Sequence, residues 1–261
     1  MSSLRGLKFL NTRAGHQANS LTYEIERRGG ISIEIPLIAI QPPENIQQRN
    51  KELMRIMKSD WLIFTSVNSF HYTCEALEEC GFEVSKVIGS KKVAVVGEKT
   101  KEIVGEYGFY VDVCPEEKFD AEHLAVSLIN ASHSTDSFFY PRSSQSRKVL
   151  VDTLLDSGRF VYEMVAYETV MNDQYQTKLN HLLKNNELDI VLVTSPSIVH
   201  SFFKQVDENV ISSIKEKIMF VAIGRVTAEA LSRYDILKVL VPDNYTIESM
   251  LDIVEEEQAD I

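Results

Sequence analysis

Paired hydroxyl side chains recur at the ends of two apolar runs in the sequence. Thr65-Ser66 and Thr194-Ser195 occupy these positions, at an offset of 129 residues. A hydroxyl at the start of a helix caps the free N–H groups of the first turn. Hydroxyls and free N–H groups at two such helix starts also form a receptor for carboxylates. Capping and anion binding both remain open for these pairs.

A second repeated pattern places a glycine three residues before a threonine. It runs from Gly97 to Thr100 and again from Gly224 to Thr227, at an offset of 127 residues. The glycine permits close approach of the backbone, and the threonine supplies a hydroxyl in the first helical turn. Neither segment is a P-loop or a GxGxxG fingerprint, so the sequence gives no motif for nucleotide binding.

Basic side chains follow the predicted strands of a chain that is acidic as a whole. Lys and Arg number 27 against 38 Asp and Glu, which gives a net charge of −11 and makes nucleic acid and anionic membrane surfaces unexpected partners. An anionic small molecule can still bind where a few cations converge in one cleft. The candidate cations are Arg13, Lys99, Arg142, Arg147, Lys148 and Arg225.

Tyr167 is the candidate acid. It lies in a β-prone segment between the two halves of the chain, where its phenol either donates a proton or hydrogen bond or simply packs in the core. The six histidines are scattered, without metal-ligand spacing, so no metal site is expected. No GxSxG elbow is present, which disfavours covalent hydrolase chemistry without excluding a triad assembled in space.

The elements that position these residues form a duplicated α/β unit. Short apolar runs alternate with helical periodicity, and several segments recur at an offset near 128 residues. This alternation predicts parallel sheets flanked by helices, with the candidate residues at the carboxyl ends of strands, where such sheets bind ligands.

Composition agrees with an ordinary globular protein. The chain has 261 residues, of which 44% are hydrophobic, enough for two modest domains. The three cysteines form no CxxC pair, and neither an apolar leader nor a run of membrane-spanning length occurs. A cytoplasmic protein is expected.

Taken together, the ordered segments resemble the uroporphyrinogen-III synthase family over nearly the whole chain. The segments that carry the resemblance are Asn11-Thr12-Arg13, Ile35-Pro36-Leu37-Ile38, Phe64-Thr65-Ser66-Val67-Asn68-Ser69, Val95-Val96-Gly97-Glu98-Lys99-Thr100, Val165-Ala166-Tyr167-Glu168-Thr169, Thr194-Ser195-Pro196-Ser197 and the run from Ala222 to Leu231. One departure is Arg225, where many members of the family carry proline; it either contacts a carboxylate or faces solvent.

The resemblance implies two similar α/β domains joined by a two-stranded β linker. The first domain would be discontinuous, made of residues 1–35 and 172–261, and the second would span residues 42–164. The linkers would be residues 36–41 and 165–171. The family expectation is a monomer.

The resemblance also implies a reaction, the cyclisation of hydroxymethylbilane to uroporphyrinogen III in heme biosynthesis. This lyase reaction inverts ring D and releases water, without a metal or organic cofactor. Tyr167 would assist departure of the hydroxyl, and the other motif positions would bind substrate. These positions are Thr65, Ser66, Lys99, Thr100, Ser195, Ser197 and Thr227, with Arg13 and Arg142 added from their strand-end positions.

Two other functions stay open. A catalytically inactive, synthase-like module would use the same groups to sense a tetrapyrrole. A two-domain glycosyltransferase is the nearest architectural rival among enzymes, but the nucleotide-diphosphate motif that it would need is not seen.

Overall fold

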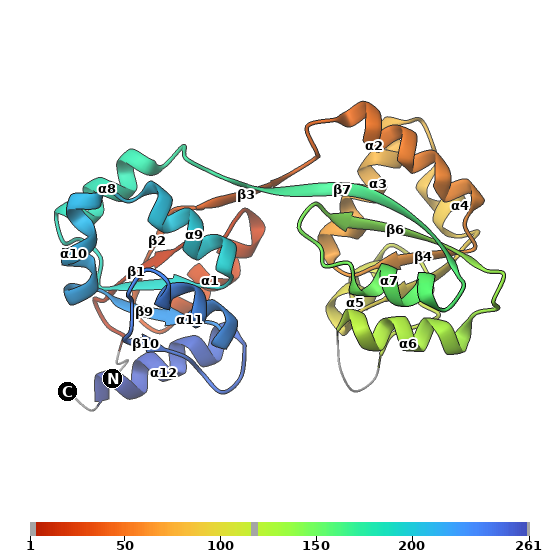
Figure 1. The fold of residues 1–261 in the computed structure, drawn as a ribbon. Helices are drawn as coiled ribbons and strands as arrows, with labels where there is room; N and C mark the ends of the chain where they lie inside the picture. Colours follow the sequence, from red (N-terminus) through yellow and green to blue (C-terminus); the bar gives the residue numbers. More distant parts are fainter. Residues whose placement is uncertain (1–3, 116–119, 260–261) are drawn as a thin grey trace. The chain divides into compact units, whose positions relative to one another are not determined.

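A computed structural model describes residues 4–115 and 120–259 of the chain. It divides into two compact units, here called the first unit and the second unit (Figure 1). The first unit comprises Met1–Ala39 and Val170–Ile261, and the second comprises Ile40–Thr169. No described helix is both long enough and apolar enough to cross a membrane.

The first unit contains a sheet whose strand pairs are parallel. Its strands, in spatial order, are β10 (Val239–Leu240), β9 (Met219–Ala222), β8 (Ile190–Val193), β1 (Lys8–Asn11) and β2 (Ile31–Glu34). Every residue of β8 is buried, as expected of a central parallel strand that is covered on both faces.

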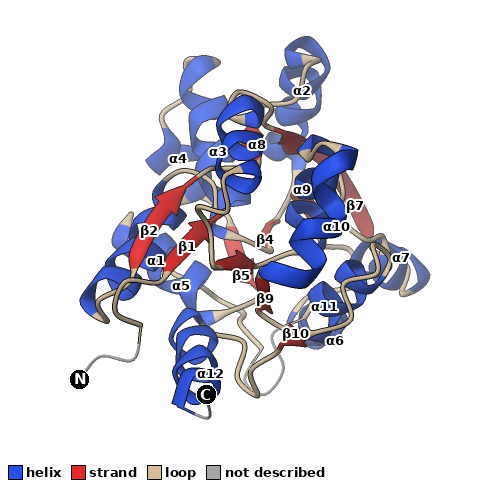
Figure 2. Ribbon diagram, turned by 90° about the vertical axis from the view of Figure 1, so that its left-hand side faces the viewer, coloured by secondary structure: helices blue, strands red, loops and turns tan. Residues whose placement is uncertain are grey.

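Helices cover both faces of this sheet. One apolar cluster joins the sheet to α8 (Gln176–Lys184), α9 (Pro196–Gln205), α10 (Glu208–Lys217) and α11 (Arg225–Ser232). A second cluster joins the opposite face to α1 (His16–Arg27) and α12 (Ile247–Ala259). Figure 2 shows α9 and α10 on one side of strands β1 and β2, and α1 on the other.

The second unit repeats this plan. Its strands, in spatial order, are β3 (Ile38–Gln41), β7 (Phe160–Met171), β6 (Ser137–Ser143), β4 (Trp61–Phe64) and β5 (Lys92–Val95). Parallel pairing joins β7, β6, β4 and β5. The boundaries between the units fall within β3 and β7, which are hydrogen-bonded neighbours.

The helices of the second unit also form two layers. One apolar cluster includes α2 (Ile46–Leu53), the 3₁₀ helix η1 (Met54–Lys58), α3 (Val67–Glu79), α4 (Val84–Ile88) and α5 (Glu98–Glu106). The other cluster includes α6 (Ala121–Ala131) and α7 (Val149–Asp156). The predicted fold class, α/β with parallel sheets flanked by helices, is confirmed.

A register shift interrupts the pairing of β6 with β7. Arg142 is opposite Val165, but Ser143 is opposite Tyr167, so Ala166 is an extra residue on β7. Such bulges turn a side chain away from the face that simple alternation assigns to it. Here Ala166 and Tyr167 are consecutive, yet both belong to the cluster beneath α3.

Candidate functional site

Tyr167 lies where β7 passes the end of β6, and the bulge directs its ring into the second unit. Only 9% of its surface is exposed. Its phenol oxygen is 3.1 Å from the Ser66 hydroxyl oxygen. Its ring stacks on Tyr72 of α3, with centroids 5.6 Å apart, and the Tyr72 hydroxyl donates to the Ile40 carbonyl at 2.7 Å. The ring is therefore held on two sides.

Burial raises the pKa of the Tyr167 phenol above its ordinary value. Contacts with the hydroxyls of Ser66 and Ser143 act in the opposite direction, but they do not reverse the shift in pKa. The phenol therefore keeps its proton at neutral pH and is available as a hydrogen-bond donor or general acid.

Ser66 joins this phenol to the start of α3. Its hydroxyl oxygen accepts the Ser69 backbone N–H at 3.1 Å, and the Ser69 hydroxyl completes a reciprocal capping box. Beside it, the Thr65 hydroxyl is 3.5 Å from the phenol oxygen of Tyr140. Ser66 is thus both a helix cap and the nearest polar neighbour of Tyr167.

Lys99 and Thr100 lie in the first turn of α5, directly after β5. Gly97 is the N-cap residue and offers no side chain to the free N–H groups. Thr100 is buried, whereas Lys99 is exposed and forms no ion pair with any described residue. This helix start therefore presents backbone N–H groups and one exposed cation without an ion pair among the described residues.

The prediction that Arg142 follows a strand is wrong. It lies inside β6, because pairing with β7 continues through Pro141 to Ser143. Its Nε donates to the Glu163 carboxylate at 2.6 Å, and its Nη1 donates to the Ser143 carbonyl at 3.0 Å. Its charge is therefore paired within the sheet, which weakens its case as a substrate contact.

Arg13, its counterpart in the first unit, has fewer hydrogen-bond partners for its guanidinium. It lies just after β1, and its Nη2 donates to the Gln17 side-chain oxygen at 3.3 Å. Its Nε is buried and has no partner among the described residues, and burial lowers the pKa of the guanidinium. A buried N–H without a partner is costly, so an incoming anion would be stabilised here.

Ser195, Ser197 and Thr227 complete the predicted set in the first unit. Ser195 caps α9, accepting the Ile198 N–H at 3.3 Å, and its hydroxyl is 3.1 Å from that of Ser197. Thr227 is buried in the first turn of α11, whose N-cap residue, Gly224, again offers no side chain. All three residues follow β8 or β9, at the same edge of one parallel sheet.

The structure gathers the candidates into two sets, one in each unit. In the second unit, Thr65, Ser66, Lys99 and Thr100 follow the neighbouring strands β4 and β5, and Tyr167 lies within β7 beside the carboxyl end of β6. Sequence reasoning did not identify Tyr72 and Ser143, which surround the Tyr167 phenol. Nothing in their local sequence marks them, since their proximity depends on the β7 bulge and on the packing of α3.

Each unit thus offers hydroxyls and helix N-termini suited to carboxylates, and the second unit adds a protonated phenol. The profile of the family described as uroporphyrinogen-III synthase HemD matches residues 19–252. The chain belongs to the uroporphyrinogen-III synthase family.

Relatives support this membership of the uroporphyrinogen-III synthase family across nearly the full length. A putative uroporphyrinogen-III synthase of Methanocaldococcus jannaschii is 30% identical over 95% of this chain and 98% of its own. The uroporphyrinogen-III synthase of Chlorobaculum parvum is 24% identical over 90% of this chain and 93% of its own. The crystal structure of uroporphyrinogen-III synthetase from Helicobacter pylori has the same fold, with a TM-score of 0.64, 15% identity and coverage of 97% of this chain and 99% of that one.

Proposed function

We propose that this protein is a uroporphyrinogen-III synthase, a lyase that cyclises hydroxymethylbilane to uroporphyrinogen III with inversion of ring D and release of water. Family membership supports the reaction class. The observation that carries the proposal for this chain is the buried, protonated Tyr167 phenol beside Ser66.

The first step requires departure of the terminal hydroxyl of the substrate. Tyr167 donates its phenolic hydrogen to that oxygen as the C–O bond breaks, and water leaves. The pyrrole nitrogen supplies the electron pair, which leaves an azafulvene. Ser66, 3.1 Å from the phenol oxygen, orients the phenol and stabilises the charge that develops on it.

The next steps rearrange carbon–carbon bonds. The substituted α-carbon of ring D attacks the exocyclic methylene carbon of the azafulvene to give a spiro intermediate. Cleavage of the bond from ring D to its former bridging carbon, followed by rejoining at the other ring D position and loss of a proton, inverts the ring. Unaided closure gives the type I isomer, so the main task of the protein is to hold the substrate in the reactive geometry.

The remaining candidates bind the carboxylates of the substrate. Helix N-termini with hydroxyl neighbours suit eight carboxylates better than a single cationic cluster would, because they spread the stabilisation over many N–H groups. Arg13 adds a guanidinium that is poor in partners. We propose Thr65, Lys99, Thr100, Ser195, Ser197 and Thr227 as the other contacts.

A coupled assay tests this function directly. Hydroxymethylbilane is generated from porphobilinogen by its own synthase, this protein is added, and the oxidised uroporphyrin isomers are separated by chromatography. Predominant type III product is expected, with and without a chelator, since no metal is expected to take part. Only type I product from folded protein would contradict the proposal, and binding of hydroxymethylbilane in that case would favour a tetrapyrrole sensor.

A further inference from the structure

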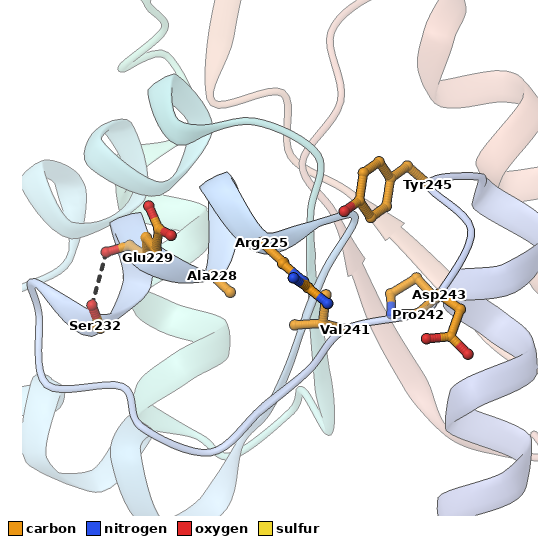
Figure 3. A pocket seen from close by; sticks show the side chains of 8 residues that line it. All are labelled: Arg225, Ala228, Glu229, Ser232, Val241, Pro242, Asp243 and Tyr245. Atoms are coloured by element: carbon orange, nitrogen blue, oxygen red, sulfur yellow. Dashed lines mark hydrogen bonds between the residues drawn. The ribbon is translucent and has the colours of Figure 1, made fainter.

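A pocket of about 440 Å³ opens within the first unit, beside the helix that carries Thr227. One wall is the first two turns of α11, and the other is the segment that follows β10 (Figure 3). Because β9 and β10 are parallel neighbours, the pocket lies at the carboxyl edge of the sheet, where open α/β sheets bind ligands. The lining residues are Arg225, Ala228, Glu229, Ser232, Val241, Pro242, Asp243 and Tyr245.

Arg225 is the cation of this pocket. Its side chain extends from the first position of α11 toward Val241 (Figure 3). It forms neither a hydrogen bond nor an ion pair with any residue in the described ranges. At the same position of the second unit, the first residue of α5 is Glu98, which pairs with Lys101 at 3.3 Å. The first helical position is therefore cationic and unpaired in the first unit, but acidic and paired in the second.

Tyr245 supplies an aromatic wall. A Cβ atom on Gly224 would lie 3.1 to 3.4 Å from its ring, so the ring packs directly over the glycine that begins α11. The ring is nevertheless 61% exposed, and Val241 and Pro242 line the pocket near it. An aromatic ring on a ligand could stack here beside a cation.

Two carboxylates, those of Glu229 and Asp243, also line the pocket. Neither is within ion-pair distance of Arg225 or of another cation in the described part of the chain. They would repel a second anion, so the pocket suits a ligand fragment with a single carboxylate near Arg225. Its volume falls in the range of small-molecule pockets, about 300–1,000 Å³, and exceeds what a lone carboxylate needs.

We infer that this pocket binds one pyrrole ring of the substrate, with one of its two carboxylate arms on Arg225, the other directed away from Glu229 and Asp243, and its ring against Tyr245. The inference rests on the proposed function, which supplies a ligand made of carboxylate-bearing pyrroles. It assigns to Arg225, a departure from the family pattern, a role in substrate affinity rather than in the chemical step.

The direct test uses pyrrole-3-propionate, a single ring with one carboxylate, and follows side-chain NMR signals during titration. Shifts at Arg225 and Tyr245 are expected in the wild-type protein. Arg225→Gln should raise the Kd at least about fivefold, and Arg225→Lys should recover part of the loss. Arg233→Gln is the matched control, because Arg233 is an exposed cation at the end of the same helix but outside the pocket.

Glu229→Gln should change the Kd in the opposite direction to Arg225→Gln. Removal of this negative charge should lower the Kd about twofold, and it should likewise lower the KM for hydroxymethylbilane, which Arg225→Gln raises. Damage to the fold would weaken binding in both variants, so opposite signs separate the electrostatic effect from misfolding. Absence of NMR shifts in the wild-type protein, or equal effects of Arg225→Gln and Arg233→Gln, would overturn the inference.

The two proposals fail in different ways. If the protein makes type III product and Arg225→Gln leaves both Kd and KM unchanged, the pocket assignment is wrong and the synthase function stands. If only type I product forms while pyrrole-3-propionate still binds in an Arg225-dependent manner, the pocket assignment stands without the synthase function.

Discussion

The two units share the order of four strands, β9-β8-β1-β2 in the first and β5-β4-β6-β7 in the second, but they have different side chains at equivalent helix starts. Ser66 and Ser195 cap the helices after β4 and β8. The Ser66 hydroxyl also contacts the Tyr167 phenol, whereas the side-chain contact of the Ser195 hydroxyl within the described residues is with Ser197. The caps therefore belong to the duplicated scaffold, and the proposed acid, Tyr167, belongs to the second unit. Comparison of equivalent positions separates residues that hold the fold from residues that could act on a ligand.

Tyr167→Phe should have the largest effect on activity, because it removes the phenol that distinguishes the second unit. Removal of the phenolic proton donor should lower kcat about 100-fold, the lower end of the range for general acid–base groups. The measurement is steady-state formation of type III isomer. Tyr162→Phe is the matched control, because Tyr162 lies on the same strand and its hydroxyl bonds no residue of the described chain. Equal kcat for Tyr167→Phe and wild type would remove Tyr167 from the mechanism.

The pH profile of kcat tests the same assignment without a mutation. In the proposed mechanism the active form is the protonated phenol, and burial raises the pKa of this phenol above the ordinary value of 10.0. Activity should therefore be lost only as pH rises through this elevated pKa, and kcat should stay level from about pH 7 to pH 9. A decline within that interval that disappears in Tyr167→Phe would show that the pKa is not raised.

The two arginines give the next largest contrast. Arg13→Gln should raise the KM for hydroxymethylbilane about tenfold. The Arg13 guanidinium has few partners within the described residues, so its charge is available to bind a carboxylate of the ligand. Arg142→Gln should leave KM nearly unchanged and destabilise the second unit by about 1 kcal/mol, because it leaves Glu163 without its partner. Urea unfolding monitored by the fluorescence of Trp61, the sole tryptophan and a residue of the second unit, measures the loss.

The reversed pattern would show that Arg142 exchanges Glu163 for substrate. In that case Arg142→Gln raises KM and Arg13→Gln does not. Arg13→Lys serves as the control for charge alone, since lysine keeps the positive charge but lacks the Nε–H of arginine.

Much of the fold could be predicted because the patterns that mark its strands and its helix starts are local in the sequence. Apolar runs such as Ile190–Val193 mark buried parallel strands, and the repeated Thr-Ser and Gly-x-x-Thr segments mark helix starts at one edge of each sheet. The end of β6 could not be predicted, because Pro141 and Arg142 resemble a turn and are held in the strand only by pairing with β7. The domain limits at residues 35, 42, 164 and 172 stay a prediction.

The two serine caps should have equal effects on stability and unequal effects on activity. Ser66→Ala and Ser195→Ala should each cost about 1 kcal/mol of local stability, since each removes an N-cap acceptor. Only Ser66→Ala should also lower kcat, about fivefold, through its contact with Tyr167. Hydrogen exchange of amides in α3 and α9 measures the stability, and Ser66→Thr tests rescue. Equal losses of kcat would make both residues structural.

Only part of the candidate site could be predicted from the sequence. The position of Tyr167 could be predicted as a junction, but simple strand alternation places it on the face opposite Ala166. The bulge instead puts Tyr167 on the same face as Ala166. No residue type in the local sequence predicts a bulge between parallel strands. The contacts with Tyr72 and Ser143 follow from it. Long-range packing therefore decides the environment of the acid, whereas local patterns predict the helix starts.

The smallest effects should come from the equivalent threonines of α5 and α11. Thr100 and Thr227 are both buried, and in the described chain neither hydroxyl bonds another residue. Thr→Val keeps their shape, so each variant should keep the stability of wild type within about 1 kcal/mol. If both hydroxyls bind carboxylates, each change should raise KM about threefold without affecting kcat. A rise for Thr227→Val alone would mean that the first unit, which also carries Arg13 and Arg225, supplies most of the affinity, while the second unit supplies the acid.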